Sequence, residues 1–297
     1  MSVLTLNQIF KSYGKVQALK GVSFEVPRGS VFGILGPNGS GKTTLLSIIL
    51  DVLNADGGAY SWFGQPGSKL QRRGIGSLLE TPNFYHYLSA VNNLKITQSI
   101  SGRGNEEQIM GVLKKVNLFE RRNSRFSTYS LGMKQRLAIA GTLLGNPEVL
   151  VFDEPTNGLD PVGIAEIRDL IRELHEHGHT IIMASHLLDE VEKVCSHVAI
   201  LKAGELITTG TVDEVLADET IVEVSAENMT ALNEILSAFP DVKNQQWQEH
   251  QITLHFNKGE DPAENLNKFC FERGIVLKQL HTRKKKLEAR FFELTNN

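Results

Sequence analysis

The sequence lacks the features that mark several classes of protein. Its 297 residues include only two cysteines, Cys195 and Cys270, which cannot form a disulfide framework or a multi-thiolate metal site. No run approaches the roughly 18 apolar residues that span a bilayer, and the N-terminus lacks the charged start and apolar core of a signal peptide. The net charge of −3 supplies no basic field for nucleic acid or anionic lipid. We therefore expect a cytosolic globular protein, and at ~150 residues per domain its length predicts two domains.

A glycine-rich loop connects a strand-like segment to a helix-like segment. Residues 30–35 are apolar with β character, and an apolar stretch of helical density runs from Leu45 to Leu53. Between them, residues 36–44 read GPNGSGKTT and match the pattern G-x-x-x-x-G-K-[ST]. Glycines let consecutive backbone N–H groups point at phosphate oxygens, and the helix N-terminus adds a positive dipole end. The loop predicts a nucleotide site in which Lys42 reaches the β- and γ-phosphates and Thr43 holds Mg²⁺.

Two acids end a second apolar strand about a hundred residues later. Residues 148–152 are followed by Asp153 and Glu154, and ligands bind at the carboxyl ends of buried parallel strands. We expect Asp153 to bind Mg²⁺ and Glu154 to orient or deprotonate the water that attacks the γ-phosphate. A further strand, residues 180–184, leads to His186, which is placed to contact the γ-phosphate. A simple strand stop is the alternative, and the neighbouring P-loop disfavours it.

A second anion-binding helix end is predicted near residue 130. Ser130 is a candidate helix cap, and Gly132 allows close approach of a ligand. One phosphate tail cannot easily occupy both helix ends within one chain. The second end is therefore expected to serve the nucleotide of another subunit.

As an ordered set, these motifs resemble the nucleotide-binding subunits of ABC transporters over residues 3–217. Residues 36–44 resemble the Walker A loop, residues 129–133 occupy the place of the signature, and residues 149–154 resemble Walker B with its catalytic glutamate. Asp160 resembles the aspartate of the D-loop, and His186 resembles the switch histidine. The resemblance implies an ATP site that includes an adenine-stacking tyrosine, formed by Tyr13, Val16, Gly36, Asn38, Gly39, Ser40, Gly41, Lys42, Thr43 and Thr44.

The resemblance also implies an architecture and partners. Residues 1–218 would form an α/β P-loop domain with a RecA-like core, an antiparallel β subdomain and a helical subdomain at about 84–145. The chain would dimerise head to tail with a second copy of itself or with a similar ATPase subunit, with each ATP between Lys42 of one copy and Ser130 and Gly132 of the other. Separate transmembrane permease subunits would hold the chain at the cytoplasmic face of a bacterial membrane. No nucleic-acid partner is expected.

Two departures from the family pattern point to one branch of the family. Leu131 and Met133 stand where the signature usually has Gly and Gln, and Glu80 stands where a Gln usually contacts Mg²⁺. A charged Glu80 can still ligate the metal. Both departures are similar to the bacitracin-resistance and multidrug-exporter branch, which implies export.

Residues 219–297 show a different pattern with no catalytic constellation. The expected elements are a strand at 221–224, a helix at 229–239, strands at 243–247 and 252–256, a helix that starts at Pro262 after an Asp261 cap and that Gly274 ends, and a strand at 275–280. This β-α-β-β-α-β order is the split βαβ, ferredoxin-like arrangement. We expect an accessory domain for dimer contact or regulation.

Other interpretations stay open at this point. A soluble ABC ATPase acting on nucleic acid, ribosomes or iron–sulfur assembly is the main alternative, although no long coiled coil, tandem domain or basic face is evident. A binding module without turnover is disfavoured by Glu154 and His186. The histidines within 175–179 are compatible with a metal site, but histidines also suit the negative end of a helix, and Gly178 favours a helix end.

Overall fold

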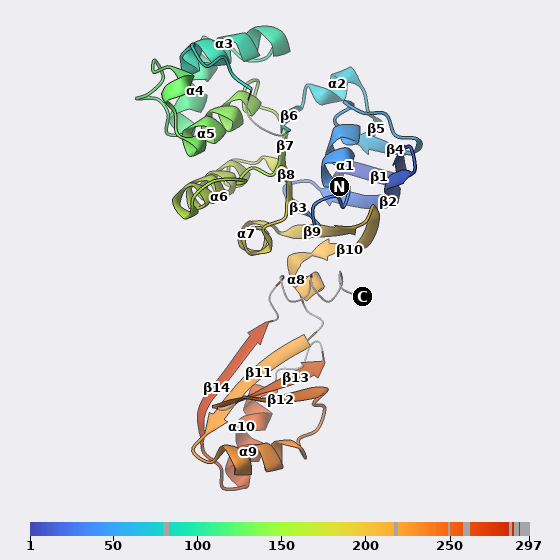
Figure 1. The fold of residues 1–297 in the computed structure, drawn as a ribbon, viewed down its shortest axis with the longest axis vertical. Coiled ribbons are helices and arrows are strands. Elements are labelled where there is room, and N and C mark those ends of the chain that lie inside the picture. The colour runs from blue at the N-terminus through green and yellow to red at the C-terminus, as the bar shows by residue number, and fades with distance from the viewer. Residues whose placement is uncertain are drawn as a thin grey trace. The chain divides into compact units, whose positions relative to one another are not determined.

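The computed structural model describes residues 1–79, 83–216, 219–248, 250–257, 262–284, 287 and 291. The chain divides into two compact units, Met1–Gly210 and Thr211–Asn297, each with its own hydrophobic core (Figure 1). Residue 218 lies outside the described residues, so a boundary there stays a prediction. Within the described parts of the chain, no helix is both long and apolar enough to cross a membrane.

A six-stranded sheet forms the centre of the first unit. Its order is β10-β9-β3-β8-β7-β6, with parallel pairing from β9 to β6. The strands are β3 (Val31–Leu35), β6 (Ile75–Leu78), β7 (Val149–Asp153), β8 (Thr180–Ser185), β9 (His197–Lys202) and β10 (Glu205–Thr211). All residues of β3, β7 and β8 are buried, as their continuous apolar runs predict. Because these three strands are parallel neighbours, the segments that follow them meet at one sheet edge.

Helices follow the strands that carry the predicted site. Helix α1 (Lys42–Ile49) starts directly at the end of the glycine-rich loop and stops before Leu53, because Asp51 turns the chain with φ +61°. Helix α6 (Pro161–Glu176) follows β7, and helix α7 (Leu188–Val194) follows β8. A Cβ at Gly33 would lie 2.7 Å from Val191 Cγ1 and 3.1 Å from Cys195 Sγ, so α7 packs directly on β3 only because residue 33 is glycine.

An antiparallel sheet completes the core beside α1, as the family resemblance predicted. It has the order β2-β1-β4-β5, formed by β1 (Ser2–Tyr13), β2 (Val16–Pro27), β4 (Gly57–Trp62) and β5 (Gln65–Pro66). Trp62 is fully buried, and its indole N–H donates to the Ile49 carbonyl at 2.8 Å. The short helix α2 (Lys69–Arg72) precedes β6.

A group of helices lies to one side of the central sheet (Figure 1, green). It comprises α3 (Ala90–Ser101), α4 (Glu106–Lys115), a 3₁₀ turn (Phe126–Thr128) and α5 (Leu131–Thr142). Ser89 and Asn105 cap α3 and α4 by accepting from backbone N–H groups in the first turn. The helices expected at 84–145 are therefore present.

The second unit has the predicted β-α-β-β-α-β order after a short helix, α8 (Val212–Leu216). Its elements are β11 (Glu219–Ala226), α9 (Met229–Leu236), β12 (Asn244–Gln248), β13 (Gln251–Asn257), α10 (Ala263–Glu272) and β14 (Leu277–Lys284). The sheet order is β12-β13-β11-β14 with antiparallel pairing throughout. Helix α9 ends at Leu236, three residues before the predicted Phe239. Phe239 itself precedes Pro240, a position that avoids helical backbone angles.

The histidines at 175–179 mark the end of α6, as the preferred interpretation predicted. Gly178 has φ +93°, and each histidine ring contacts a backbone carbonyl: His175 that of Gly29, His177 that of Glu173 and His179 that of Pro147. Among the described residues, no three or more His, Cys, Asp or Glu side chains are grouped so that they could hold a metal ion. The contacts with backbone carbonyls and the turn at Gly178 favour the interpretation as a helix end.

Candidate active site

The glycine-rich loop lines a cavity of about 710 Å³ together with residues from the β1–β2 hairpin. The structure brings most of the predicted ATP-site residues to this one cavity: Tyr13, Val16, Asn38, Gly39, Ser40, Gly41, Lys42, Thr43, Thr44 and Glu154. Lys15, Gln17, Ala18, Lys20 and Ala203 complete its lining, and no motif in the sequence predicted them.

Two glycines make the loop's tight path possible. A Cβ at Gly36 would lie 2.3 Å from Ser40 Oγ and 2.4 Å from the Leu201 carbonyl oxygen. Gly41 has φ +105°, and a Cβ there would lie 2.6 Å from the Ala18 carbonyl oxygen. No other residue type fits either position without moving backbone.

The loop presents unsatisfied polar groups to the cavity. Ser40 Oγ is buried and has no hydrogen-bond partner in the described chain, and no side chain caps the N-terminus of α1. The Lys42 side chain is only 6% exposed, and its ammonium donates to the Gly36 carbonyl at 2.8 Å. A buried cation, an orphaned hydroxyl and a free helix N-terminus together fit a phosphate tail.

Glu154 and His186 meet beside the same loop. The Glu154 carboxylate lies 2.8 Å from His186 Nδ1 and 3.6 Å from Lys42 Nζ. Glu154 has φ +48°, a left-handed conformation that is rare outside glycine, and its backbone N–H donates to the Ala184 carbonyl of β8 at 3.0 Å. Unusual backbone angles of this kind concentrate at functional sites. The predicted neighbourhood of Lys42, Glu154 and His186 is therefore present.

Of the three residues predicted to hold Mg²⁺, the structure describes Thr43 and Asp153. Asp153 ends β7 with 4% exposure, and Thr43 lines the cavity at the start of α1. A hydroxyl and a carboxylate are oxygen donors of the kind that Mg²⁺ prefers. Glu80 lies outside the described residues, so its role stays a prediction.

The signature segment does not line this cavity. Ser130 caps α5 by accepting from the Met133 N–H at 3.3 Å, as predicted, and a Cβ at Gly132 would meet open space. Asp160 caps α6 by accepting from the Gly163 N–H at 2.9 Å. Neither Ser130, Gly132 nor Asp160 is part of the cavity wall.

The turn between β9 and β10 is a wall of the cavity that no motif predicted. The Gly204 N–H donates to the Ser40 carbonyl at 3.1 Å, and the Gly204 carbonyl accepts from the Lys20 N–H at 2.8 Å. The glycine turn was a visible local signal in the sequence, but its contact with the loop depends on strand order.

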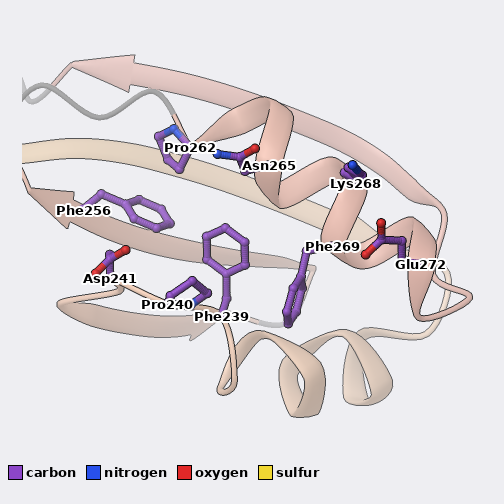
Figure 2. Close-up of a pocket in the computed structure, with 9 residues that line it drawn as sticks. All are labelled: Phe239, Pro240, Asp241, Phe256, Pro262, Asn265, Lys268, Phe269 and Glu272. Carbon is purple, nitrogen blue, oxygen red and sulfur yellow. The ribbon is translucent and has the colours of Figure 1, made fainter.

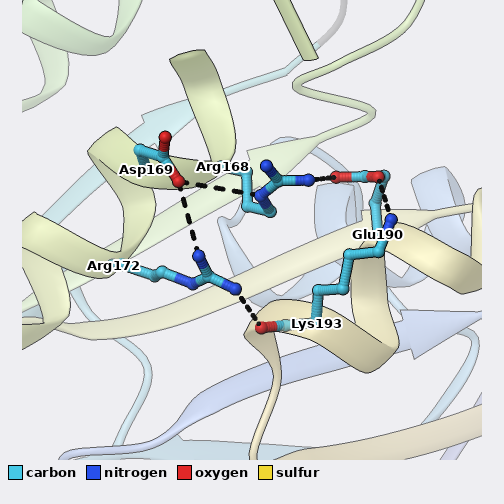
Figure 3. A network of polar contacts seen from close by, with 5 residues as sticks. All are labelled: Arg168, Asp169, Arg172, Glu190 and Lys193. Atoms are coloured by element: carbon cyan, nitrogen blue, oxygen red, sulfur yellow. Dashed lines mark hydrogen bonds and ion pairs between the residues drawn. The ribbon is translucent and has the colours of Figure 1, made fainter. Parts of the chain in front are cut away.

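A network of ion pairs joins α6 to α7, the helix that follows His186 (Figure 3). Arg168 Nη1 lies 3.3 Å from Glu190 Oε2, and Lys193 Nζ lies 3.1 Å from Glu190 Oε1. Arg172 donates to the Lys193 carbonyl at 2.9 Å and lies 3.4 Å from Asp169. The network therefore connects α6, which Asp160 caps, to α7, which starts two residues after His186.

A P-loop after β3, a carboxylate directly after β7 and a histidine paired with that carboxylate define a P-loop nucleoside triphosphatase. The three groups lie on segments that follow β3, β7 and β8. The class follows from this arrangement around one cavity.

Comparisons with known proteins identify the family. The ABC transporter family model matches residues 19–157. The lantibiotic transport ATP-binding protein SrtF of Streptococcus pyogenes is 38% identical over 205 residues, which cover 69% of this chain and 89% of SrtF. The bacitracin transport ATP-binding protein BcrA of Enterococcus faecalis is 36% identical, over 71% of this chain and 70% of BcrA. The ABC transporter ATP-binding protein YhcH of Bacillus subtilis is 35% identical, over 99% of this chain and 96% of YhcH.

A solved structure agrees with these relatives. A dimeric ATP-binding cassette in a post-hydrolysis state, bound to ADP and phosphate, matches with a TM-score of 0.63 and 26% identity. The match covers 70% of this chain and 98% of the cassette. This chain belongs to the ABC transporter ATP-binding family. It is an ATP-hydrolysing subunit of an ABC transporter, which confirms the family, fold and activity inferred from its motifs.

Proposed function

We propose that this chain works as a head-to-tail dimer that drives export through a separate transmembrane permease at the cytoplasmic face of a bacterial membrane. The observation that carries the dimer is the placement of Ser130 and Gly132. Ser130 caps the N-terminus of α5 and Gly132 lies in its first turn with open space around it, yet both lie outside the wall of the cavity that holds Lys42. A second copy placed head to tail gives this helix end a phosphate to bind.

Each predicted site residue takes a role in this scheme. Lys42 and the loop residues Gly36, Asn38, Gly39, Ser40, Gly41, Thr43 and Thr44 bind the phosphates, while Tyr13 and Val16 bind the base. Thr43, Asp153 and Glu80 hold Mg²⁺, which neutralises phosphate charge when it is bound. Asp160 belongs to the contact between copies.

Glu154 is the proposed general base for hydrolysis. Its carboxylate is held near the phosphate-binding ammonium of Lys42, and the contact with His186 orients it. A carboxylate in this position accepts a proton from the attacking water, and His186 stabilises the charge that develops on the γ-phosphate. The Lys42 ammonium lies 3.6 Å from the Glu154 carboxylate and donates to the Gly36 carbonyl at 2.8 Å.

The assignment of export, as opposed to import, rests on three residues and on two relatives. Leu131, Met133 and Glu80 depart from the usual family pattern in the way of the bacitracin-resistance branch. The similarity to SrtF and BcrA, named for lantibiotic and bacitracin transport, supports the same assignment.

Two experiments test this function. Glu154→Gln should lower steady-state ATPase activity by roughly 10²-fold or more, and the variant should accumulate as an ATP-bound dimer in size-exclusion chromatography with light scattering. Unchanged turnover would refute the role of Glu154. Affinity purification of the tagged chain from solubilised membranes should recover a polytopic permease, and recovery of only a ribosome, nucleic acid or soluble partner would refute the transport assignment.

A further inference from the structure

The second unit contains a pocket that has no part in ATP binding. Its volume is about 500 Å³, within the range of small-molecule sites. It lies between α10 and the turn that follows α9 (Figure 2). The lining residues are Phe239, Pro240, Asp241, Phe256, Pro262, Asn265, Lys268, Phe269 and Glu272.

Three phenylalanines form an aromatic row in this pocket. The Phe239 ring packs edge-to-face against both neighbours, 5.9 Å from Phe256 and 5.0 Å from Phe269 between ring centroids. Phe256 is fully buried, and the Arg273 guanidinium lies 3.5 Å from the Phe269 ring centroid, which fixes that ring from outside the pocket wall. The faces of such rings carry negative partial charge, so they attract cations.

Carboxylates lie at both ends of the row. In Figure 2, Asp241 is drawn beside Phe256 at one end of the row, and Glu272 is drawn past Phe269 at the other end. Asp241 has φ +65°, a left-handed conformation that aspartate tolerates, and this conformation sets the turn after α9. Among the described lining residues Asp241 and Glu272 are the anions and Lys268 is the cation, so these residues together carry a formal charge of −1.

We propose that this pocket binds an amphipathic organic cation, an amine or quaternary ammonium that carries an apolar ring or chain. The apolar part covers the phenylalanine row, and the cationic part lies near Asp241 or Glu272. The half-buried rings of Phe239 and Phe269 supply contact area, Phe256 supports them from below, and the two carboxylates select the sign of the charge. This site is independent of the roles proposed for the ATP cavity.

A pair of size-matched probes of opposite charge tests the proposal on the full chain. Benzyltrimethylammonium and benzylsulfonate share the benzyl group and differ in the sign of the head group. Titration by ligand-observed NMR should give a Kd for the cation about tenfold below that for the anion. Equal binding, or preference for the sulfonate, would overturn the proposal.

Charge variants locate the binding. Asp241→Asn and Glu272→Gln should each weaken binding of the cation about threefold, and Lys268→Gln should tighten it. Glu264→Gln is the matched control, because Glu264 is an exposed carboxylate on the same helix outside the pocket lining. An effect of Glu264→Gln equal to that of Glu272→Gln would refute the pocket as the site. ATP affinity should be unchanged in all four variants, which separates this result from the function of the first unit.

Discussion

Removing the charge of Glu190 should slow ATP hydrolysis without weakening ATP binding. Helix α7 has no side-chain N-cap and starts two residues after His186, so contacts made along the helix help to hold that histidine's segment, together with the direct contact of His186 with Glu154. Glu190 receives Arg168 at 3.3 Å and Lys193 at 3.1 Å, and its side chain is only 14% exposed. Glu190→Gln keeps the shape of the side chain but leaves the two cations without their shared partner.

The size of the effect follows from exposure. Fully exposed ion pairs contribute about 0.2–1 kcal/mol, and charge-assisted hydrogen bonds with some burial contribute about 1.5–3 kcal/mol. The Arg168 side chain is 21% exposed and that of Lys193 is 49% exposed, so we expect a loss of about 1 kcal/mol in the free energy of unfolding, mostly from Arg168. Lys193→Gln is the matched control and should cost about 0.3 kcal/mol.

Steady-state ATPase kinetics provide the assay. Because Glu190 acts on His186 and does not line the nucleotide cavity, we expect kcat to fall about fivefold with KM unchanged. A double-mutant cycle checks the route: in a His186→Gln background, Glu190→Gln should cause no further loss. The reasoning fails if Glu190→Gln destabilises the protein but keeps the wild-type kcat, or if the two losses in kcat multiply.

Three further predictions concern single residues. Gly36→Ala should abolish ATP binding in equilibrium titration, because its Cβ would lie within 2.4 Å of two atoms, whereas Gly111→Ala, with open space around its Cβ, should bind ATP normally. Burial lowers the pKa of His179 below its usual 6.5, so below about pH 6.5 the unfolded chain binds more protons than the folded chain. The free energy of unfolding, measured by urea titration, should therefore fall as the pH drops below about 6.5. His179→Gln should weaken this dependence of the free energy of unfolding on pH. Burial raises the pKa of the Cys195 thiol far above its usual value, so its labelling by a disulfide reagent should be slow until the protein unfolds, and fast labelling of the native chain would contradict this.

The sequence predicts the backbone conformation of some residues at the site but not of others. The glycines of the loop predicted a tight turn, and the structure shows which contacts require them at Gly36 and Gly41. No residue pattern in the sequence signals the left-handed backbone of Glu154, whose N–H donates to the Ala184 carbonyl on the neighbouring strand β8. Helix α9 ends at Leu236, three residues before the end that the pattern of residues 229–239 predicts.

The sequence by itself determined those parts of the site whose residues are neighbours along the chain. The phosphate loop, the acids after β7 and the cap at Ser130 are local motifs, since each needs only neighbouring residues and the type of element they join. The tertiary structure alone decided the far wall of the cavity at Ala203, the ion pairs between α6 and α7, and the phenylalanine row of the second unit. These depend on strand order and helix packing, which bring residues together that are distant in sequence and carry no local signal of their contact.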